Sequence, residues 1–372
     1  MEQVLYSLPD GWKYQKLKTL IKMHYGKALK ATDRIEGEVP VYGSNGVVGS
    51  HNEHLWDQPT VVIGRKGSVG EANLAFTPSW TIDTAYYVEI IDHKVLNLMY
   101  FYYFADRFDV SSISQKGVKP GINRNDYLNL SFPLPPINEQ ERIVEKLDAL
   151  LTRIDTAIEH LQESVTLADA LYASYVNSLL TPPENQPDSR NLSSSSGSWE
   201  WKKIEDVFTI TSGKNLTKKD MVENGEYAVY GGNGVAGRFS DFNLDGTNII
   251  IGRVGALCGN VRLISEKIWI TDNAFFIKEY KLDISKEFLA KVLDALNLGS
   301  TANKAAQPVI SYKSIKELTI PYPPLLQQEK IVSDLNVLYI KQQKNQELLQ
   351  GKIENLLQLK ASILDSAFKG EL

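Results

Sequence analysis

Two long stretches of the chain carry apolar residues at alternating steps of three and four positions. This spacing is typical of the seam of a coiled coil and predicts two long helices. The first begins near Asn138 and ends before Pro182, and the second runs from about Gln327 to Phe368. Each would be roughly 60 Å long at ~1.5 Å per residue. Because neither helix should stand alone with an apolar seam, we expect them to pair with each other, antiparallel.

The segments before each long helix alternate short β-branched or aromatic runs with glycine. Such runs predict strands, for example at Thr60–Ile63, Ala85–Val88 and Asn248–Ile251. One further helix is predicted near Val95–Phe108, with a counterpart near Lys286–Leu296. The expected fold class is therefore α+β, with two similar β-rich globular parts separated by two long antiparallel helices.

The chain contains an internal repeat. Tyr42-Gly-Ser-Asn-Gly46 recurs as Tyr230-Gly-Gly-Asn-Gly234, and Ile63-Gly-Arg-Lys-Gly67 recurs as Ile251-Gly-Arg-Val-Gly255. The period is far too long for a solenoid, so the chain reads as two copies of one unit related by a pseudo-two-fold axis. The predicted segments are a first globular domain (1–132), a central spacer helix (133–181), a flexible Ser- and Pro-rich linker (182–198), a second globular domain (199–320) and a C-terminal helix (321–372).

The composition restricts the class of protein. The chain has 372 residues, a net charge of −5 and one cysteine, Cys258, so an intrachain disulfide is excluded and a reducing, cytoplasmic location is expected. No apolar run reaches the length of a membrane span. The acidic balance argues mildly against nucleic acid as a partner. However, residues 131–190 hold 10 acidic and 4 basic side chains, so the globular parts are close to neutral and each can carry a basic face.

Four motifs together resemble the specificity subunits of type I restriction–modification systems, over essentially the whole chain. The first is Leu8-Pro-Asp-Gly-Trp12 at the start. The others occur in both copies: the Tyr-Gly-x-Asn-Gly turns, the Ile-Gly-Arg-x-Gly strands and the Pro-x-Pro-Pro-x-x-x-Gln-Glu-x-Ile-Val helix starts. Each motif alone is weak, but two copies in the same order with two long helices are specific.

The resemblance implies two target-recognition domains, each of which reads one half of a gapped site in double-stranded DNA. It implies that the helices act as a spacer and as the docking surface for two modification (methyltransferase) subunits, which bind S-adenosylmethionine and methylate adenine. Restriction subunits would join this complex to cut DNA. The chain itself would be a non-catalytic subunit with no cofactor of its own and no membrane contact.

Arg65 and Arg253 occupy the same position in the two copies, at a glycine-flanked strand end. Arginine reads guanine and grips phosphate with a planar fork, so both are predicted to contact DNA. The alternative is a structural arginine that pairs with a nearby carboxylate, such as Asp83 or Asp272.

Basic and amide side chains in turns and loops complete the predicted contacts. The loop 116–124 is basic and glycine-containing, which suits phosphates or a groove, and a solvated loop is the alternative. The Asn-Gly pairs predict tight hairpin turns first and adenine contacts second. The candidates are Lys27, Asn45, Lys66, Lys116, Lys119 and Arg124 in the first copy, and Lys214, Asn233, Lys304 and Gln307 in the second.

Two other classes of function stay open from the residues alone. One is a coiled-coil scaffold that carries two non-nucleic-acid ligand-binding modules, for example for glycans or peptides. The other is an enzyme with a site in the glycine-rich loops. Against an enzyme, Gly213-Lys214 lacks the upstream glycine of a phosphate-binding loop, and one cysteine with five histidines gives no recognisable triad. We therefore predict no catalytic and no metal-binding residue.

Overall fold

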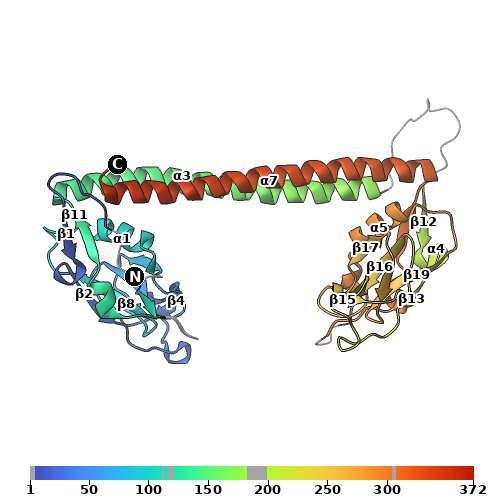
Figure 1. Ribbon diagram of the computed structural model, residues 1–372, viewed down its shortest axis with the longest axis horizontal. Coiled ribbons are helices and arrows are strands. Elements are labelled where there is room, and N and C mark those ends of the chain that lie inside the picture. Colours follow the sequence, from blue (N-terminus) through green and yellow to red (C-terminus); the bar gives the residue numbers. More distant parts are fainter. Residues whose placement is uncertain (1–4, 111–112, 116–120, 182–198, 304–306) are drawn as a thin grey trace. The chain divides into compact units, whose positions relative to one another are not determined.

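The computed structural model describes residues 5–110, 113–115, 121–181, 199–303 and 307–372. It separates the chain into two compact units, Met1–Glu163 with Leu349–Leu372, and Ser164–Leu348. Each unit combines a globular, sheet-containing part with portions of two long helices (Figure 1). The predicted linker, 182–198, lies outside the described residues.

The globular part of the first unit is built from short strands and one main helix. The expected strands at Thr60–Ile63 and Ala85–Val88 are present, and the expected helix begins three residues later than Val95. Its elements are β1 (Lys13–Lys16), η1 (Leu17–Thr19), β2 (Ile21–Tyr25), η2 (Ala31–Asp33), β3 (Val39–Gly43), β4 (Gly46–His51), β5 (Thr60–Gly64), β6 (Ala72–Ala75), β7 (Trp80–Thr81), β8 (Ala85–Ile90), α1 (Leu98–Arg107), β9 (Ser114–Gln115), β10 (Gly121–Ile122), α2 (Arg124–Leu128) and β11 (Ser131–Leu134).

Two sheets form the body of this part. One has the order β2-β8-β5-β6 and is antiparallel throughout, and the other has the order β4-β3-β7, with β3 and β7 parallel. β5 is buried along its whole length because both of its faces are covered. Val61 and Ile63 belong to the core that contains Tyr100 and Phe104 of α1, whereas Val62 packs with Tyr42 on the opposite face.

The globular part of the second unit repeats this plan. Its main sheets have the orders β13-β19-β16-β17 and β15-β14-β18, again with one parallel pair, β14 and β18. The expected strand at Asn248–Ile251 and the expected helix at Lys286–Leu296 are both found. The elements are β12 (Glu200–Lys203), α4 (Ile204–Val207), β13 (Phe208–Ser212), β14 (Tyr227–Gly231), β15 (Gly234–Phe239), β16 (Asn248–Gly252), β17 (Val261–Ile264), β18 (Ile268–Ile270), β19 (Ala274–Tyr280), α5 (Lys286–Ala295), η4 (Leu298–Thr301), α6 (Tyr312–Ile315) and β20 (Thr319–Tyr322).

The two predicted long helices are α3 (Ile137–Leu180) and α7 (Leu325–Lys369). Within the first unit they run antiparallel, since Arg142 on α3 donates to the carbonyl of Leu372 and Asp155, further along α3, pairs with Lys360. Apolar seam residues of both helices pack together there, including Ile154, Ile158 and Ile353. Within the second unit, the Nε2 atoms of Gln342 and Gln346 on α7 both donate to Asp169 on α3.

Each globular part shares its core with the helix portions of its own unit. In the first unit, Leu147 of α3 and Phe368 of α7 lie in the same buried cluster as Phe101 and Phe132. In the second unit, Leu180 of α3 and Leu335 of α7 lie in the same buried cluster as Phe288 of α5. The apolar faces of both long helices therefore also contribute to the core of the globular part. We expect globular part and helix ends to fold together, because neither buries its apolar face alone.

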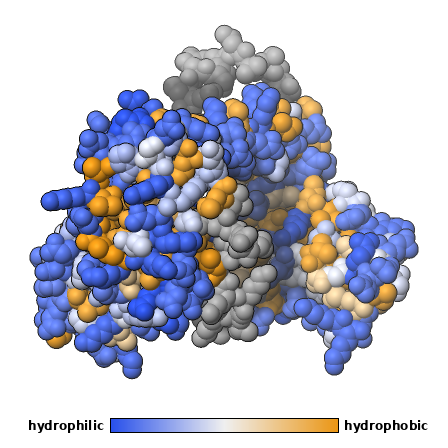
Figure 2. Space-filling view, turned by 60° about the vertical axis from the view of Figure 1, so that its left-hand side comes forward, coloured by the Kyte–Doolittle hydropathy of each residue, from blue (hydrophilic) through white to orange (hydrophobic). Residues whose placement is uncertain are grey.

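On the face of the molecule shown in Figure 2, hydrophilic residues predominate and hydrophobic ones are interspersed among them. None of the described helices combines the length and the apolar character that a bilayer span requires.

Candidate nucleic-acid interface

The segment that follows β7, and its equivalent after β18, gathers the predicted contact loops of each unit. In both units the last residue of this strand and the segment after it form backbone hydrogen bonds with two loops and one strand. These are the Gly-Lys loop (Gly26-Lys27 or Gly213-Lys214), the strand that leads into the Asn-Gly turn (β3 or β14), and the Gly-Arg loop (Gly64-Arg65 or Gly252-Arg253). In the first unit the bonds run from Lys27 N to Thr81 O (2.9 Å), from Ile82 N to Tyr42 O (2.9 Å) and from Arg65 N to Thr84 O (2.9 Å); in the second unit they run from Lys214 N to Ile270 O (3.1 Å), from Thr271 N to Tyr230 O (2.8 Å) and from Arg253 N to Asn273 O (2.9 Å).

The two shared arginines are held in the same way. Arg65 Nη1 donates to the backbone carbonyl of Asp83 at 3.2 Å, and Arg253 Nη1 donates to that of Asp272 at 3.0 Å. The alternative of a structural arginine is therefore right about the partner residue, but the acceptor is the backbone oxygen and not the carboxylate. A guanidinium has five N–H donors, so it can keep this bond and still address an acceptor on a ligand.

Each Asn-Gly pair forms a tight hairpin turn, which confirms the prediction. β3 and β4 pair up to Gly43 and Gly46, and the ladder shifts by one residue before Tyr42. The second unit has the same shift before Tyr230. The positive φ falls on Gly46 (103°) and Gly234 (108°), and the asparagines keep ordinary backbone angles. Asn45 and Asn233 are left exposed at the tips, where such bulges direct the turn outward.

A third segment completes the site of the first unit. The N–H of Ile122 donates to Arg65 O at 3.1 Å, and Arg124 opens the short helix α2 just beyond. The guanidinium carbons of Arg65 and Arg124 lie 5.0 and 5.1 Å from the ring centre of Tyr25. Tyr25 is 50% exposed and was not among the predicted residues. Two guanidiniums thus lie beside the same ring, and their positive charges would attract a bound anion.

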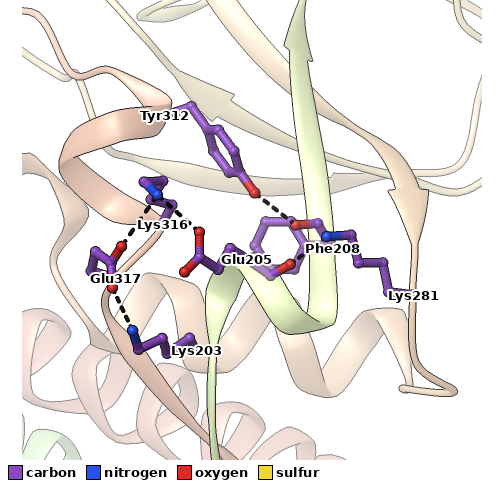
Figure 3. Close-up of polar contacts among 7 residues, drawn as sticks. All are labelled: Lys203, Glu205, Phe208, Lys281, Tyr312, Lys316 and Glu317. Carbon is purple, nitrogen blue, oxygen red and sulfur yellow. Dashed lines mark hydrogen bonds and ion pairs between the residues drawn. The ribbon is translucent and has the colours of Figure 1, made fainter.

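In the second unit, a tyrosine stands at the position equivalent to Arg124. It is Tyr312, the first residue of α6, whose hydroxyl donates to the carbonyl of Phe208 at 3.2 Å. Figure 3 shows this bond beside a chain of ion pairs that ties α6 to the start of the domain. In that chain Lys203 pairs with Glu317 at 2.6 Å, and Lys316 pairs with Glu205 at 2.9 Å and with Glu317 at 3.2 Å. Lys281 Nζ also donates to the backbone carbonyl of Glu205 at 2.6 Å. The hydrogen bonds from Lys203 and Lys316 lower the pKa of Glu317.

The Gly-Lys pairs owe their position to close backbone packing. A Cβ at Gly26 would lie 2.1 Å from Ile82 O, and one at Gly213 would lie 2.1 Å from Ile270 O, so only glycine fits. Trp80 anchors the first loop through a 2.9 Å bond from Nε1 to Lys27 O, and Trp269 bonds Lys214 O at 3.3 Å. The side chains of Lys27 and Lys214 themselves are exposed.

The structure thus brings most of the predicted residues together within each unit. The first group comprises Lys27, Asn45, Arg65, Lys66 and Arg124, with Lys66 exposed beside Gly121. In the second unit, Gln307 is exposed and the neighbouring Pro308 carbonyl accepts from Gly255 N at 3.0 Å. Lys116, Lys119 and Lys304 lie outside the described residues. Contact of any of these residues with DNA stays a prediction.

Sequence reasoning missed one pair of side chains at the hairpin turns. Asn73 on β6 is opposite Val62, and Arg262 on β17 is opposite Ile250, so the two occupy equivalent positions. Both lie against the glycine of the turn. The sequence repeat identified only motifs that are the same in both copies. Asn73 and Arg262 differ from each other, so their equivalence becomes visible only from the strand registers.

Comparisons with known proteins agree with this duplicated architecture. The family model described as "Type I restriction modification DNA specificity domain" matches residues 9–167 and 197–350. The specificity subunit of the Escherichia coli type I restriction enzyme EcoDI is 24% identical over 409 aligned positions, which cover 98% of this chain and 89% of that relative. That of the E. coli enzyme EcoprrI is 29% identical over 139 residues, only 36% of this chain and 34% of that relative.

The fold is also similar to that of solved structures. One chain from work on complex assembly and conformational transition of the type I R-M system aligns with 99% of this chain and 100% of its own length. The TM-score is 0.77 at 17% sequence identity, so this likeness concerns the fold.

Proposed function

Because the chain belongs to the family of type I restriction modification DNA specificity domains, we propose that it is the DNA-recognition subunit of a type I restriction–modification enzyme. Each globular part reads one half of a bipartite, gapped site in double-stranded DNA. The chain supplies sequence specificity and no catalysis, and its partner subunits supply methylation and cleavage. The alternative of a scaffold for other ligands has no support in the comparisons.

One observation carries the proposal: the same site is built twice around a shared arginine, with unlike neighbours. Arg65 and Arg253 keep the same backbone bond. Lys66 and Arg124, in contrast, correspond to the neutral Val254 and Tyr312. A common scaffold with different side chains suits a target with two different halves, because base identity is read by side chains at the groove edges.

The long helices supply a surface for the partner subunits. In the second unit, Leu171 on α3 and Ile340 on α7 are 72% and 66% exposed. A groove of about 500 Å³ lies between the two helices there, lined by Tyr172, Tyr175 and Leu338 among others. Exposed apolar side chains along a groove are typical of protein interfaces. We assign this surface to a modification subunit, infer two such subunits per chain, and expect S-adenosylmethionine to bind to them and not to this chain.

A methylation map tests the proposed function. The chain would be co-expressed with the modification subunit of its own organism, and host DNA sequenced by a method that detects methyladenine. We expect a gapped motif with two unlike halves that vanishes when this chain is omitted. A stable complex that leaves no motif would contradict the proposal. Binding of the complex to its site should also weaken steeply with salt, since cations condensed on DNA are released on binding.

A further inference from the structure

Asn73 and Arg262 occupy equivalent positions at the base of the two hairpin turns and differ in chemistry. An added Cβ at Gly46 would lie 3.2 Å from Asn73 Oδ1, and one at Gly234 would lie 3.2 Å from Arg262 Nη2. Both residues are half-buried. The same strand position therefore touches the same turn in each unit, once with a neutral amide and once with a guanidinium.

The guanidinium of Arg262 is fixed from two sides. Nη1 donates to Asn260 Oδ1 at 2.8 Å, and Nη2 donates to the carbonyl of Asn233 at 3.5 Å. These bonds use two of its five N–H donors. The orientation of the fork is thereby set beside the exposed tip of the turn, and the remaining donors can address a ligand. Fixing a side chain before binding reduces the entropy that binding costs.

Asn73 presents different chemistry at the first turn. Among the described residues, its Nδ2 is buried without a hydrogen-bond partner. A buried donor without a partner is costly, so a turn of the amide that brings Nδ2 to an acceptor on binding would be favoured. An amide also offers a donor and an acceptor side by side, which is the pattern that matches the edge of adenine, whereas arginine matches the edge of guanine.

The positive charges of the two sites are consequently distributed differently. Each unit has the shared arginine, Arg65 or Arg253. The first unit adds Arg124 over Tyr25, on the side of α2. The second unit has Tyr312 at that position and adds Arg262 at the hairpin. The position of the second guanidinium is thus one feature that distinguishes the two sites, besides Lys66 of the first unit and its neutral counterpart Val254.

We propose that position 73/262 is a specificity-determining position: Arg262 selects guanine in the half-site of the second unit, and Asn73 selects adenine in that of the first. This inference rests on the proposed function, because it assumes that the hairpins face a DNA groove. It adds that the strand behind the turn, and not only the turn itself, determines which bases are accepted.

The test exchanges the two residues in the co-expressed complex. Arg262→Asn should change the base preference at one position of one half-site by about tenfold or more, and leave the other half-site unchanged. Asn73→Arg should alter only the other half-site. Base preferences are measured from the methylation frequency of every variant of the wild-type motif in host DNA.

Arg238→Asn is the matched control. Arg238 on β15 also binds backbone carbonyls, those of Gly225 and Glu226 just before β14 (both at 2.5 Å), at the end of the hairpin away from the turn. We expect this variant to leave the motif unchanged. Arg262→Lys keeps the charge and loses the fork, so it should reduce guanine preference while retaining binding.

The outcomes separate the two proposals. Absence of any gapped motif with the wild-type chain would overturn the proposed function. A wild-type motif that Arg262→Asn leaves unchanged, or weakens equally at all sequences, would overturn the specificity role alone. If Arg262→Asn does not form a complex, Arg262→Lys decides: an altered base preference supports the role, and an unaltered one overturns it.

Discussion

A buried glutamine joins each globular part to its long helix, and its removal should destabilise the unit that contains it. Gln140 is 0% exposed. Its Oε1 accepts from Asn97 N at 2.8 Å, and its Nε2 donates to Val95 O at 2.9 Å and to Pro135 O at 3.0 Å. It therefore ties the segment before α1 to the start of α3. The sequence showed Gln140 only as part of a repeated motif.

The expected cost follows from the groups left unsatisfied. Gln140→Ala removes the partner of one backbone N–H and two carbonyls, and each buried group left without a partner costs ~1–3 kcal/mol. Two of the three bonds are only part-buried, so water can partly replace the lost partner there. The sum is then about 3 kcal/mol, which corresponds to a fall in the melting temperature of roughly 6–12 °C for a unit of this size. Gln328 is the equivalent residue, 1% exposed, with bonds to Ser285 N and Pro323 O at 2.8 Å each. Gln328→Ala should destabilise the second unit by a smaller amount.

Scanning calorimetry of the full chain measures both effects. Glu141→Ala is the matched control, because Glu141 is the next residue and is exposed; it should change stability by no more than about 0.5 kcal/mol. If Gln140→Ala melts like Glu141→Ala, the buried amide does not hold the junction and the reasoning is wrong.

Four further effects are expected from particular side chains. Tyr127→Phe should leave the free energy of unfolding unchanged or raise it, because among the described residues the buried hydroxyl of Tyr127 lacks a hydrogen-bond partner. Tyr86→Phe instead loses a 3.1 Å bond to the carbonyl of Ile122 and should lower the free energy of unfolding by about 1 kcal/mol, measured by urea titration. Burial raises the pKa of Tyr280 to about 12, so the folded state favours the neutral phenol. The second unit should therefore lose stability as pH rises from about 10 to 12. Alkaline unfolding of Tyr280→Phe should show a weaker pH dependence. Lys27→Ala should weaken binding of the complex to cognate and random DNA alike and lower the salt slope by about one, as measured by fluorescence anisotropy. Arg65→Ala should instead relax base preference in one half-site, and an equal loss on all sequences would contradict its role as a reader.

Periodicity made the long elements predictable from the sequence. The alternating steps of three and four located α3 and α7 to within a few residues, because an apolar seam of that length has few other uses. The Asn-Gly pairs located both hairpins, since only glycine readily adopts the positive φ found at Gly46 and Gly234. The predicted start of α1 was less accurate. The side chain of Asn97 caps this helix by accepting hydrogen bonds from Met99 N and Tyr100 N, and apolar spacing does not reveal such a cap.

The composition of the candidate site was only partly predictable. Arg65 and Arg253 stood out because they recur in a repeated motif. Asn73, Arg262 and Tyr25 did not, because their relevance depends on strand register and on ring positions that a linear pattern does not contain. The partner of Arg65 also required coordinates, since the expected carboxylate of Asp83 is replaced as acceptor by its backbone oxygen.

The residues shared by the two units and those that differ follow a physical rule. Gln140 and Gln328, like Arg65 and Arg253, bond to backbone atoms. Because the backbone is common to both units, replacing such a residue would leave backbone groups without this partner in either one, at the greatest cost where they are buried, as beside the glutamines. Side chains that point away from these bonds can change at lower cost, but not freely. At the position of Arg124, the second unit carries Tyr312, and its hydroxyl has acquired its own acceptor in the carbonyl of Phe208. A duplicated recognition domain can therefore diverge in specificity at its turn and loop edges while the bonds that hold those edges stay the same.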